Sequence, residues 1–429
     1  MVTTSPVRVG VIGFSNVGAA LVRLLIEQAD DIAERTGVRL ELTRVAVRDL
    51  AKHRSMELPP GVLTDDTAAV VKDPDVDVIV ELMGGTEPAR TFILDALTAG
   101  KPVVSANKEL LANVGPELFE AAVASGVDLL FEASVGGGIP LLRPLRESLA
   151  GDRINRMMGI VNGTTNYILT RMSEAGATYG DALAEAQALG FAELDPAADV
   201  EGFDAAAKAA ILATIGFGQR VVASDVHREG ISGVTAADIA FAARLGYVVK
   251  LLAIAERVGR EVAVRVHPTM VPVTHPLAAV RDSFNAVFIE GEAVGDLMLY
   301  GPGAGGMPSA SAVLGDLVDA AHNLRAGASG RTTIPELAVI HPIAETSSQY
   351  YLSLEVEDRP GVLAAVAGVF GAHGVSIRSM EQEGLGGEAR LIFITHTALE
   401  RDMQATLSAL RDLDAVDRVG TVLRVAGQE

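Results

Sequence analysis

The sequence contains no cysteine among its 429 residues. Without thiols the chain can form neither a disulfide bond nor a metal site built from thiolates. Disulfides are typical of secreted proteins, so this absence favours a cytoplasmic location. The first residues, MVTTSPVRVGVIGF, also lack a basic segment followed by a cleavable apolar block, and they therefore do not resemble a secretory signal.

Long apolar runs and an excess of basic residues are missing as well. No stretch of about eighteen uncharged apolar residues occurs, so we expect no transmembrane helix. The formal net charge is -20, and a surface of this sign would repel the phosphates of nucleic acids and of anionic membranes. The composition therefore favours chemistry on small molecules over binding to nucleic acid or to a membrane.

The length and the apolar content indicate several folded domains. Apolar residues make up 49% of the chain, and 429 residues exceed the size of one ordinary core. Over residues 7–140, short β-branched runs alternate with helical segments, which predicts a parallel sheet with helices on both faces. We therefore expect an α/β protein whose residues 1–140 form a Rossmann-type nucleotide-binding domain.

Three further patterns divide the rest of the chain. Residues 141–300 carry Ala-rich helical segments and then strand-like runs, which predicts an α+β domain for catalysis and dimerisation. A Gly/Pro-rich turn leads into a helix at about 309–325, and we expect residues 301–326 to return to the first domain. The composition of 327–347 is typical of a linker. Residues 348–429 follow the strand-helix-strand-strand-helix-strand order of the ferredoxin-like motif.

A glycine-bearing turn follows the first expected strand, at VGVIGFSNVG. In the dinucleotide fingerprint its glycines would be Gly13, position 15 and Gly18, but position 15 is a serine. The middle glycine lets the backbone approach the pyrophosphate, so Ser15 should crowd the cofactor or push it outward. The strand-turn-helix context still predicts a dinucleotide here, with Asn16 and Val17 also in contact, whereas the alternative is a tight turn that binds no ligand.

Arg48 follows the second expected strand, where an NAD enzyme often has an acid that holds the ribose hydroxyl. An arginine at this position favours the 2′-phosphate of NADP, although NAD stays possible. The alternative is a solvated surface arginine.

The segment AELDPAADVEGFDAAAK, residues 192–208, places one lysine after five acids. If a helix begins near Asp199 or Val200, then Glu201, Asp204 and Lys208 lie on one face. A lone acid and lysine at this spacing are usually an exposed ion pair, but the apolar flanks here predict partial burial. A partly buried lysine beside an acid suits general acid catalysis.

Two neighbouring acids have a predicted role in the same site. Glu193, on the loop before the helix, could bind a substrate ammonium group, and Asp199 is either a helix cap or a second orienting acid.

The span from Ala186 to Lys208 resembles the signature of the homoserine dehydrogenases. The resemblance continues through EPARTFILDAL, VVSANKELL, EASVGGGIPLLRPLRESLAGD, GIVNGTTNYILTRM and HPLAAVRDSFNAVFIEGEAVGDLMLYGPGAG, and so covers nearly the whole chain. It implies reversible hydride transfer between a nicotinamide cofactor and the pair L-aspartate 4-semialdehyde and L-homoserine.

The resemblance also implies roles for individual residues. Lys208 corresponds to the lysine that transfers the proton, Asp204 and Glu193 to acids that bind substrate, and Lys108 to a second lysine that faces cofactor and substrate. Phe191 stands where relatives often have tyrosine. Further implied contacts with the substrate or the cofactor are Gly163, Thr164, Asp199, Ser105, Gly190 and Gly305.

Two further sites are implied by the same family. The segment EASVGGGIP resembles a loop that binds a sodium ion through Glu132, Val135, Gly137 and Ile139, and oxygen ligands suit a hard cation. The C-terminal segment resembles an ACT domain, a module that senses amino acids. Its turn, with Asp358, Gly361 and Val362, implies threonine as effector, whereas the alternative is a domain that only dimerises. Paired ACT domains imply a homodimer or homotetramer.

Two other functions are alternatives to that of a homoserine dehydrogenase. A catalytically weak amino-acid sensor on the same scaffold is the main alternative, and Ser15 is the feature that favours it. A dehydrogenase of 2-hydroxy acids would need an arginine to bind the substrate carboxylate and a histidine to carry the proton. The available histidines, His227, His267 and His275, do not lie in such a constellation.

Overall fold

The computed structural model describes residues 5–52, 56–330, 336–384 and 388–426. Its first sheet is parallel and has the order β3-β2-β1-β4-β5-β6, which is the Rossmann order. The Rossmann-type fold predicted for this region is therefore confirmed. The strands are β1 (Val7–Ile12), β2 (Leu40–Ala46), β3 (Leu63–Thr64), β4 (Val78–Glu81), β5 (Val103–Ser105) and β6 (Leu129–Leu130).

Helices cover both faces of this sheet because alternate residues of each strand point to opposite sides. Val9 and Val11 share one core with Leu21, Ile32 and Val313, whereas Ile12 shares the other with Val70 and Leu110. One face is thus covered by α1 (Asn16–Glu27), α2 (Ala29–Thr36) and α11 (Gly306–Ala326). The other face is covered by α3 (Thr67–Lys72), α4 (Ala89–Thr98) and α5 (Lys108–Ser125).

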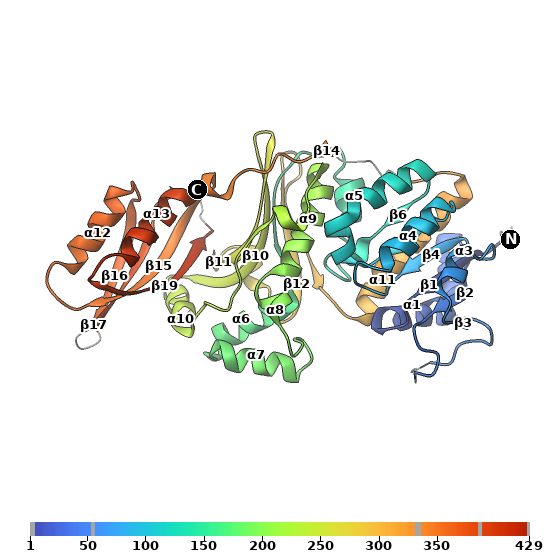
Figure 1. Cartoon of the computed structure of the whole chain (residues 1–429), viewed down its shortest axis with the longest axis horizontal. Helices are drawn as coiled ribbons and strands as arrows, with labels where there is room; N and C mark the ends of the chain where they lie inside the picture. The colour runs from blue at the N-terminus through green and yellow to red at the C-terminus, as the bar shows by residue number, and fades with distance from the viewer. Residues whose placement is uncertain (1–4, 53–55, 331–335, 385–387, 427–429) are drawn as a thin grey trace.

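The middle of the chain forms a second, mostly antiparallel sheet with the order β13-β12-β7-β10-β11. Its strands are β7 (Ile154–Ile160), β10 (Tyr247–Val258), β11 (Glu261–Pro272), β12 (Phe284–Gly291) and β13 (Gly295–Pro302). The helices are α6 (Gly163–Ala175), α7 (Tyr179–Ala188), α8 (Ala197–Val200), α9 (Phe203–Phe217) and α10 (Ala236–Arg244). Helix α9 contacts β10 and β11 as well as α5, and so joins the second sheet to the first domain (Figure 1).

The C-terminal region has the ferredoxin-like order that the sequence predicts, with the spatial strand order β19-β15-β17-β16. Its elements are β15 (Ser347–Glu357), α12 (Val362–Ala372), β16 (Ile377–Gly384), β17 (Glu388–Thr395), β18 (Ala398–Leu399), α13 (Glu400–Arg411) and β19 (Val416–Val425). β19 also pairs in parallel with β11, at Thr269 with Arg424 and Met270 with Val425. The second and third sheets are therefore one continuous sheet, which no sequence pattern predicts.

Several short elements complete the fold. Helical turns lie at Glu132–Ser134, Pro144–Ser148, Ala223–Asp225, Pro276–Ala279 and Ile343–Glu345, and short strands are β8 (Gln219–Arg220), β9 (His227–Arg228) and β14 (Glu336–Leu337). Within the predicted linker 327–347, β14 pairs with β8, and residues 331–335 lie outside the described residues. No helix in the described segments is both long and apolar enough to cross a bilayer.

The start of the helix that carries Lys208 differs from the prediction. The prediction of one helix from Asp199 or Val200 is wrong, because α8 ends at Val200 and α9 begins at Phe203. Gly202 between them has a φ of 80°, a left-handed conformation that breaks a right-handed helix and that glycine adopts at little cost. Glu201 therefore does not share a helix face with Asp204.

Candidate active site

Helix α9 carries Asp204 and Lys208 one turn apart. The Lys208 Nζ donates to Oδ2 of Asp204 and to the carbonyl oxygen of Val161, both at 2.7 Å. Only 11% of the Lys208 side chain and 8% of the Asp204 side chain are exposed. The pair is therefore a buried ion pair and not a solvated one on the surface.

Small residues allow this helix to be buried. Five of its eleven buried residues are alanines, and their short side chains let the backbone approach β10, β11 and α5 closely. The buried alanines are Ala205, Ala206, Ala209, Ala210 and Ala213.

A second lysine reaches Asp204 from the nucleotide-binding domain. Lys108 is the first residue of α5, and its Nζ lies 3.0 Å from Oδ1 of Asp204. Burial alone would raise the pKa of Asp204, but the charges of Lys208 and Lys108 and the hydrogen bonds to its carboxylate lower this pKa overall. The Asp204 charge in turn raises the pKa of Lys108 against the effect of burial. One ionised carboxylate thus bridges two ammonium groups from two domains.

Asn162 completes this cluster, although the sequence reasoning missed it. Its Nδ2 donates to Asp204 Oδ2 at 2.8 Å and to Asp199 Oδ1 at 2.6 Å. Its Oδ1 accepts from the backbone N–H of Thr165 at 2.9 Å and so caps α6. An asparagine between a strand and a helix signals a cap, but nothing in the sequence signals that its amide faces two acids.

A cleft of about 1000 Å³ lies over this cluster, between the nucleotide-binding domain and the second sheet. It also contains Glu109, Asn113 and Phe284, which the sequence reasoning did not single out. The predicted site residues that line it are Asn16, Lys108, Gly163, Thr164, Gly190, Phe191, Glu193, Asp199, Asp204, Lys208 and Gly305.

Residues 190–195 form one wall of the cleft, in which the Phe191 side chain is packed and the Glu193 side chain is exposed to solvent. The Phe191 ring packs against Tyr167 with 4.9 Å between ring centroids, and its carbonyl oxygen accepts from Thr164 Oγ1 at 2.6 Å. Glu193 is exposed, and its carboxylate makes no hydrogen bond or ion pair within the part of the chain that the structure describes. Glu193 is therefore available to a positively charged ligand.

The glycine turn follows β1 at the carboxyl end of the first sheet. Its Asn16 lines the cleft, whereas Gly13, Ser15, Val17 and Gly18 do not. A Cβ on Gly13, whose φ is 103°, would lie 2.6 Å from the carbonyl oxygen of Leu82, and one on Gly18 would lie 2.2 Å from that of Gly13. Both glycines are thus required by the packing of the turn. Ser15 is exposed, and its side chain accepts no hydrogen bond from an N–H group of α1. The first turn of α1 contains no acid. Val17 packs against the core.

Two other predicted cofactor contacts also lie outside the cleft lining. Ser105 is buried, and its Oγ donates to Oε2 of Glu81 at 2.8 Å. The other oxygen of Glu81 accepts from the backbone N–H groups of Met83 and Gly84 at 2.8 and 3.2 Å, so this acid shapes the loop after β4. Arg48 is exposed, two residues beyond the end of β2.

The residues predicted to bind sodium and an effector lie elsewhere. The carboxylate of Glu132 accepts from the backbone N–H groups of Leu141, Leu142 and Arg143 at 2.5 to 2.8 Å. Val135, Gly137 and Ile139 are buried on the adjoining loop. A separate cleft of about 370 Å³ at the start of α12 is lined by Asp358, Gly361 and Val362.

A buried lysine supports one wall of the large cleft from behind. The Lys250 Nζ donates to Oδ1 of Asn166 at 3.0 Å and to the carbonyl oxygen of Val280 at 2.5 Å. Asn166 Nδ2 donates to the carbonyl oxygens of Asp282 and Phe284 at 2.9 and 3.2 Å. Burial lowers the pKa of Lys250 to about 8. Together these contacts hold residues 280–284, which include the cleft residue Phe284.

Known protein families match most of the chain. Residues 140–318 match the family model described as homoserine dehydrogenase, and residues 13–132 match that of the homoserine dehydrogenase NAD binding domain. Residues 350–415 match the ACT domain.

Whole proteins are similar over nearly the full length. A homoserine dehydrogenase of Corynebacterium glutamicum is 50% identical, over 98% of this chain and 96% of its own, and one of Bacillus subtilis is 44% identical over 98% of both. The crystal structure of a homoserine dehydrogenase from Thiobacillus denitrificans has a TM-score of 0.93 at 41% identity, over 98% of both chains. A hyperthermophilic archaeal homoserine dehydrogenase in complex with NADPH has a TM-score of 0.62 at 30% identity, over 74% of this chain and 98% of its own.

Replacing Lys250 by methionine should change how stability depends on pH. The folded-state pKa of about 8 lies below the ordinary value of 10.5, so between these values the unfolded chain binds a proton that the folded protein has released. The folded wild-type protein therefore gains stability as pH rises from 8 to 10.5 and loses it as pH falls, by at most about 3 kcal/mol from this one group. Lys250→Met should lack this dependence.

The measurement is urea unfolding at pH 8, 9 and 10, and the quantity compared is the difference between variant and wild type. Lys72→Met, which removes a positive charge at an exposed position, is the control and should keep the wild-type dependence. Equal pH dependence in Lys250→Met and wild type would contradict the prediction.

Proposed function

Because this chain belongs to the homoserine dehydrogenase family, we propose that it reduces L-aspartate 4-semialdehyde to L-homoserine reversibly with NADP, within threonine and methionine synthesis. The observation that carries this proposal is the buried pair of Lys208 and Asp204, with the half-exposed Lys108 beside it, on the floor of a cleft between the two sheets. A carbonyl reduction needs a proton donor in a protected site, and this cluster supplies an ammonium group there.

The chain's own residues bind the substrate and move the proton. When bound, the cofactor supplies the hydride acceptor or donor at its nicotinamide ring. In reduction the Lys208 Nζ gives a proton to the substrate oxygen, and in the reverse direction it takes that proton back. Asp204 keeps the lysine oriented through the 2.7 Å contact, Lys108 stands on the other side of the same carboxylate, and the free carboxylate of Glu193 binds the substrate ammonium group.

Lys208→Met should lower kcat/KM for homoserine oxidation by about 10³, because the proton acceptor is removed while the methionine fills a similar volume. The affinity for NADPH, followed by its fluorescence, should change less than twofold. Lys101→Met, which alters a lysine of the first domain outside the cleft, is the control and should keep native kinetics.

Two outcomes would contradict parts of this proposal. A kcat/KM of Lys208→Met within tenfold of the wild-type value would contradict the proton-transfer role of Lys208. Wild-type protein that turns over neither substrate yet binds threonine would favour the alternative, a sensor on a dehydrogenase scaffold.

The nucleotide turn and Arg48 support NADP as the preferred cofactor. The first turn of α1 carries no acid and no side-chain cap, so its N–H groups suit a pyrophosphate. Ser15 is exposed, and its side chain is thus not part of the packed core of the turn. Arg48, exposed beyond β2, supplies a positive charge for a 2′-phosphate, with Gly13, Val17, Gly18 and Ser105 as supporting residues of the turn and sheet.

Arg48→Ala should reduce the ratio of kcat/KM with NADP to kcat/KM with NAD by about tenfold or more, since a charged hydrogen bond contributes about 1.5–3 kcal/mol. The ratio is measured from initial rates with both cofactors on one preparation. An unchanged ratio would make Arg48 a surface residue with no part in the choice of cofactor.

A sodium ion fits the loop after Glu132. The carbonyl oxygens of Val135, Gly137 and Ile139 accept no hydrogen bond from any residue that the structure describes, and all three residues are buried. Unpaired carbonyl oxygens suit a hard cation. The side chain of Glu132 is occupied by three N–H groups, whereas its backbone oxygen accepts only one long hydrogen bond, from the Val135 N–H at 3.4 Å. This backbone oxygen is therefore the better candidate. Equal turnover in sodium and in potassium buffers would contradict a sodium requirement.

The cleft at the start of α12 is the proposed site for threonine. Gly361 has a φ of 92° and begins α12 without a side-chain cap, and N–H groups there suit an amino-acid carboxylate. Asp358, on the rim of the cleft, offers a carboxylate for the amino group.

Asp358→Asn should raise the threonine concentration for half-maximal inhibition by about tenfold, because the charged contact is lost, and should leave turnover without threonine unchanged. Inhibition curves measure both quantities. Equal curves for variant and wild type would exclude Asp358 from the effector site.

The remaining parts of the proposal concern assembly and location. We expect a homodimer or homotetramer in the cytoplasm, and β13 and β16 are the outer strands of the long sheet, where a second copy could pair. Sedimentation measures the oligomer directly. The domain boundaries at residues 140, 300, 326 and 347, which come from the sequence patterns, are also part of the proposal.

A further inference from the structure

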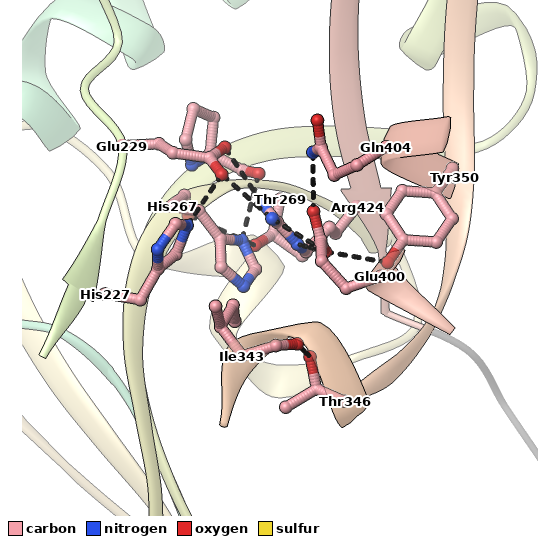
Figure 2. A network of polar contacts seen from close by, with 11 residues as sticks. His227, Glu229, His267, Thr269, Ile343, Thr346, Tyr350, Glu400, Gln404 and Arg424 are labelled. Atoms are coloured by element: carbon pink, nitrogen blue, oxygen red, sulfur yellow. Dashed lines mark hydrogen bonds and ion pairs between the residues drawn. The ribbon is translucent and has the colours of Figure 1, made fainter. Parts of the chain in front are cut away.

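Part of the contact between the catalytic region and the ACT domain is a buried ion cluster centred on Arg424 of β19 (Figure 2). Its Nη1 and Nη2 each donate to one carboxylate oxygen of Glu229 at 2.8 Å. Its Nε and Nη2 donate to Glu400 Oε2, in α13, at 3.0 and 2.9 Å. Only 6% of the Arg424 side chain is exposed. One guanidinium therefore joins an acid of the catalytic region to an acid of the ACT domain.

Neighbouring groups hold both acids in place. Glu400 accepts from the Tyr350 hydroxyl at 2.8 Å and from Gln404 Nε2 at 2.8 Å. Glu229 also contacts His227 Nε2 at 2.9 Å. Burial would raise the pKa of Glu229, but the hydrogen bonds from His227 and Arg424 and the Arg424 charge lower it overall. A fork-like pair of this kind fixes geometry as well as charge.

Glu229 lies in a short segment, residues 227–231, which we call the connector. Its first two residues form β9, which pairs with β11, and the Glu229 N–H donates to the carbonyl oxygen of Val266 at 2.8 Å. The Ile231 N–H donates to the carbonyl oxygen of Val200 at 2.8 Å. A Cβ on Gly230 would lie 2.5 Å from the same oxygen. The connector therefore lies closely against the end of α8.

The connector also touches the start of α9. The Arg228 guanidinium lies 3.3 Å from the centroid of the Phe203 ring and donates to the carbonyl oxygen of Glu201 at 3.3 Å. A Cβ on Gly202 would lie 3.5 Å from the carbonyl oxygen of Glu229. Asp204 is the second residue of α9. A shift of the connector would therefore displace the backbone at the start of α9, the helix that carries Asp204.

We propose that the Arg424–Glu229 ion pair positions Asp204, so that the ACT domain sets the geometry of the catalytic cluster through the connector. This inference rests on the proposed function. Glu229 and Arg424 line no part of the catalytic cleft and act as positioning residues. Loss of the pair leaves the connector free to move, and Asp204 then holds Lys208 and Lys108 less accurately, which slows proton transfer.

Glu229→Gln and Arg424→Lys test the proposal. The first keeps the volume and one acceptor oxygen, and the second keeps the charge but loses the fork. Each should lower kcat for homoserine oxidation by about tenfold, since small displacements of catalytic groups cost one to two orders of magnitude. Rates are divided by the concentration of NADPH-binding sites, so that unfolded protein does not count, and the affinity for NADPH should stay within twofold of wild type.

Arg244→Ala is the matched control. Arg244 also joins the two regions, through Glu383 at 2.9 Å, but from α10 and without contact to the connector. It should keep native kcat. Native kcat in both test variants with a lower unfolding temperature would show a purely structural role and overturn the proposal, as would loss of NADPH binding in both. An inactive wild-type protein would instead contradict the proposed function.

Discussion

The arrangement of the catalytic region depends on one buried negative charge. A carboxylate removed from water is costly unless opposite charges and hydrogen bonds surround it. Asp204 meets this requirement with Lys208 from its own helix, Lys108 from the nucleotide-binding domain and Asn162 from the start of α6. Three separate segments are therefore held against one another by the same group that orients the lysine expected to carry the proton. Stability and chemistry impose the same geometry here.

Much of this arrangement can be predicted from the sequence, because it depends on local patterns. Val9, Val11 and Val78 point to one side of the first sheet because successive residues of a strand point to opposite faces. Asp204 and Lys208 are four residues apart, which places them on one face of a helix. Local patterns of this kind can be predicted. The helix break at Gly202 could not, because a glycine in an Ala-rich run does not reveal the sign of its φ. The donor role of Asn162 depends on a contact across 42 residues.

The continuity of the second and third sheets is another feature of tertiary origin. β11 and β19 meet over only two residue pairs, and neither strand shows in its own pattern which neighbour it will have. The short pairing is reinforced by the buried ions around Arg424, whose partners are separated by up to 195 residues. An ACT domain attached by a shared sheet and a buried ion pair is coupled to the catalytic region more rigidly than one on a flexible linker, since neither contact can slide without breaking.

The return of α11 to the first sheet means that this domain is built from both ends of the first 326 residues. Ala310, Val313 and Leu317 close the core that contains Val9 and Leu21. One face of the sheet, which α1 and α2 cover only in part, therefore stays partly exposed until α11 has been synthesised. During synthesis, the nucleotide-binding domain is therefore incomplete while the whole catalytic region leaves the ribosome. A fragment cut after residue 140 should be prone to aggregate, and dividing the gene between these domains would separate a sheet from its cover.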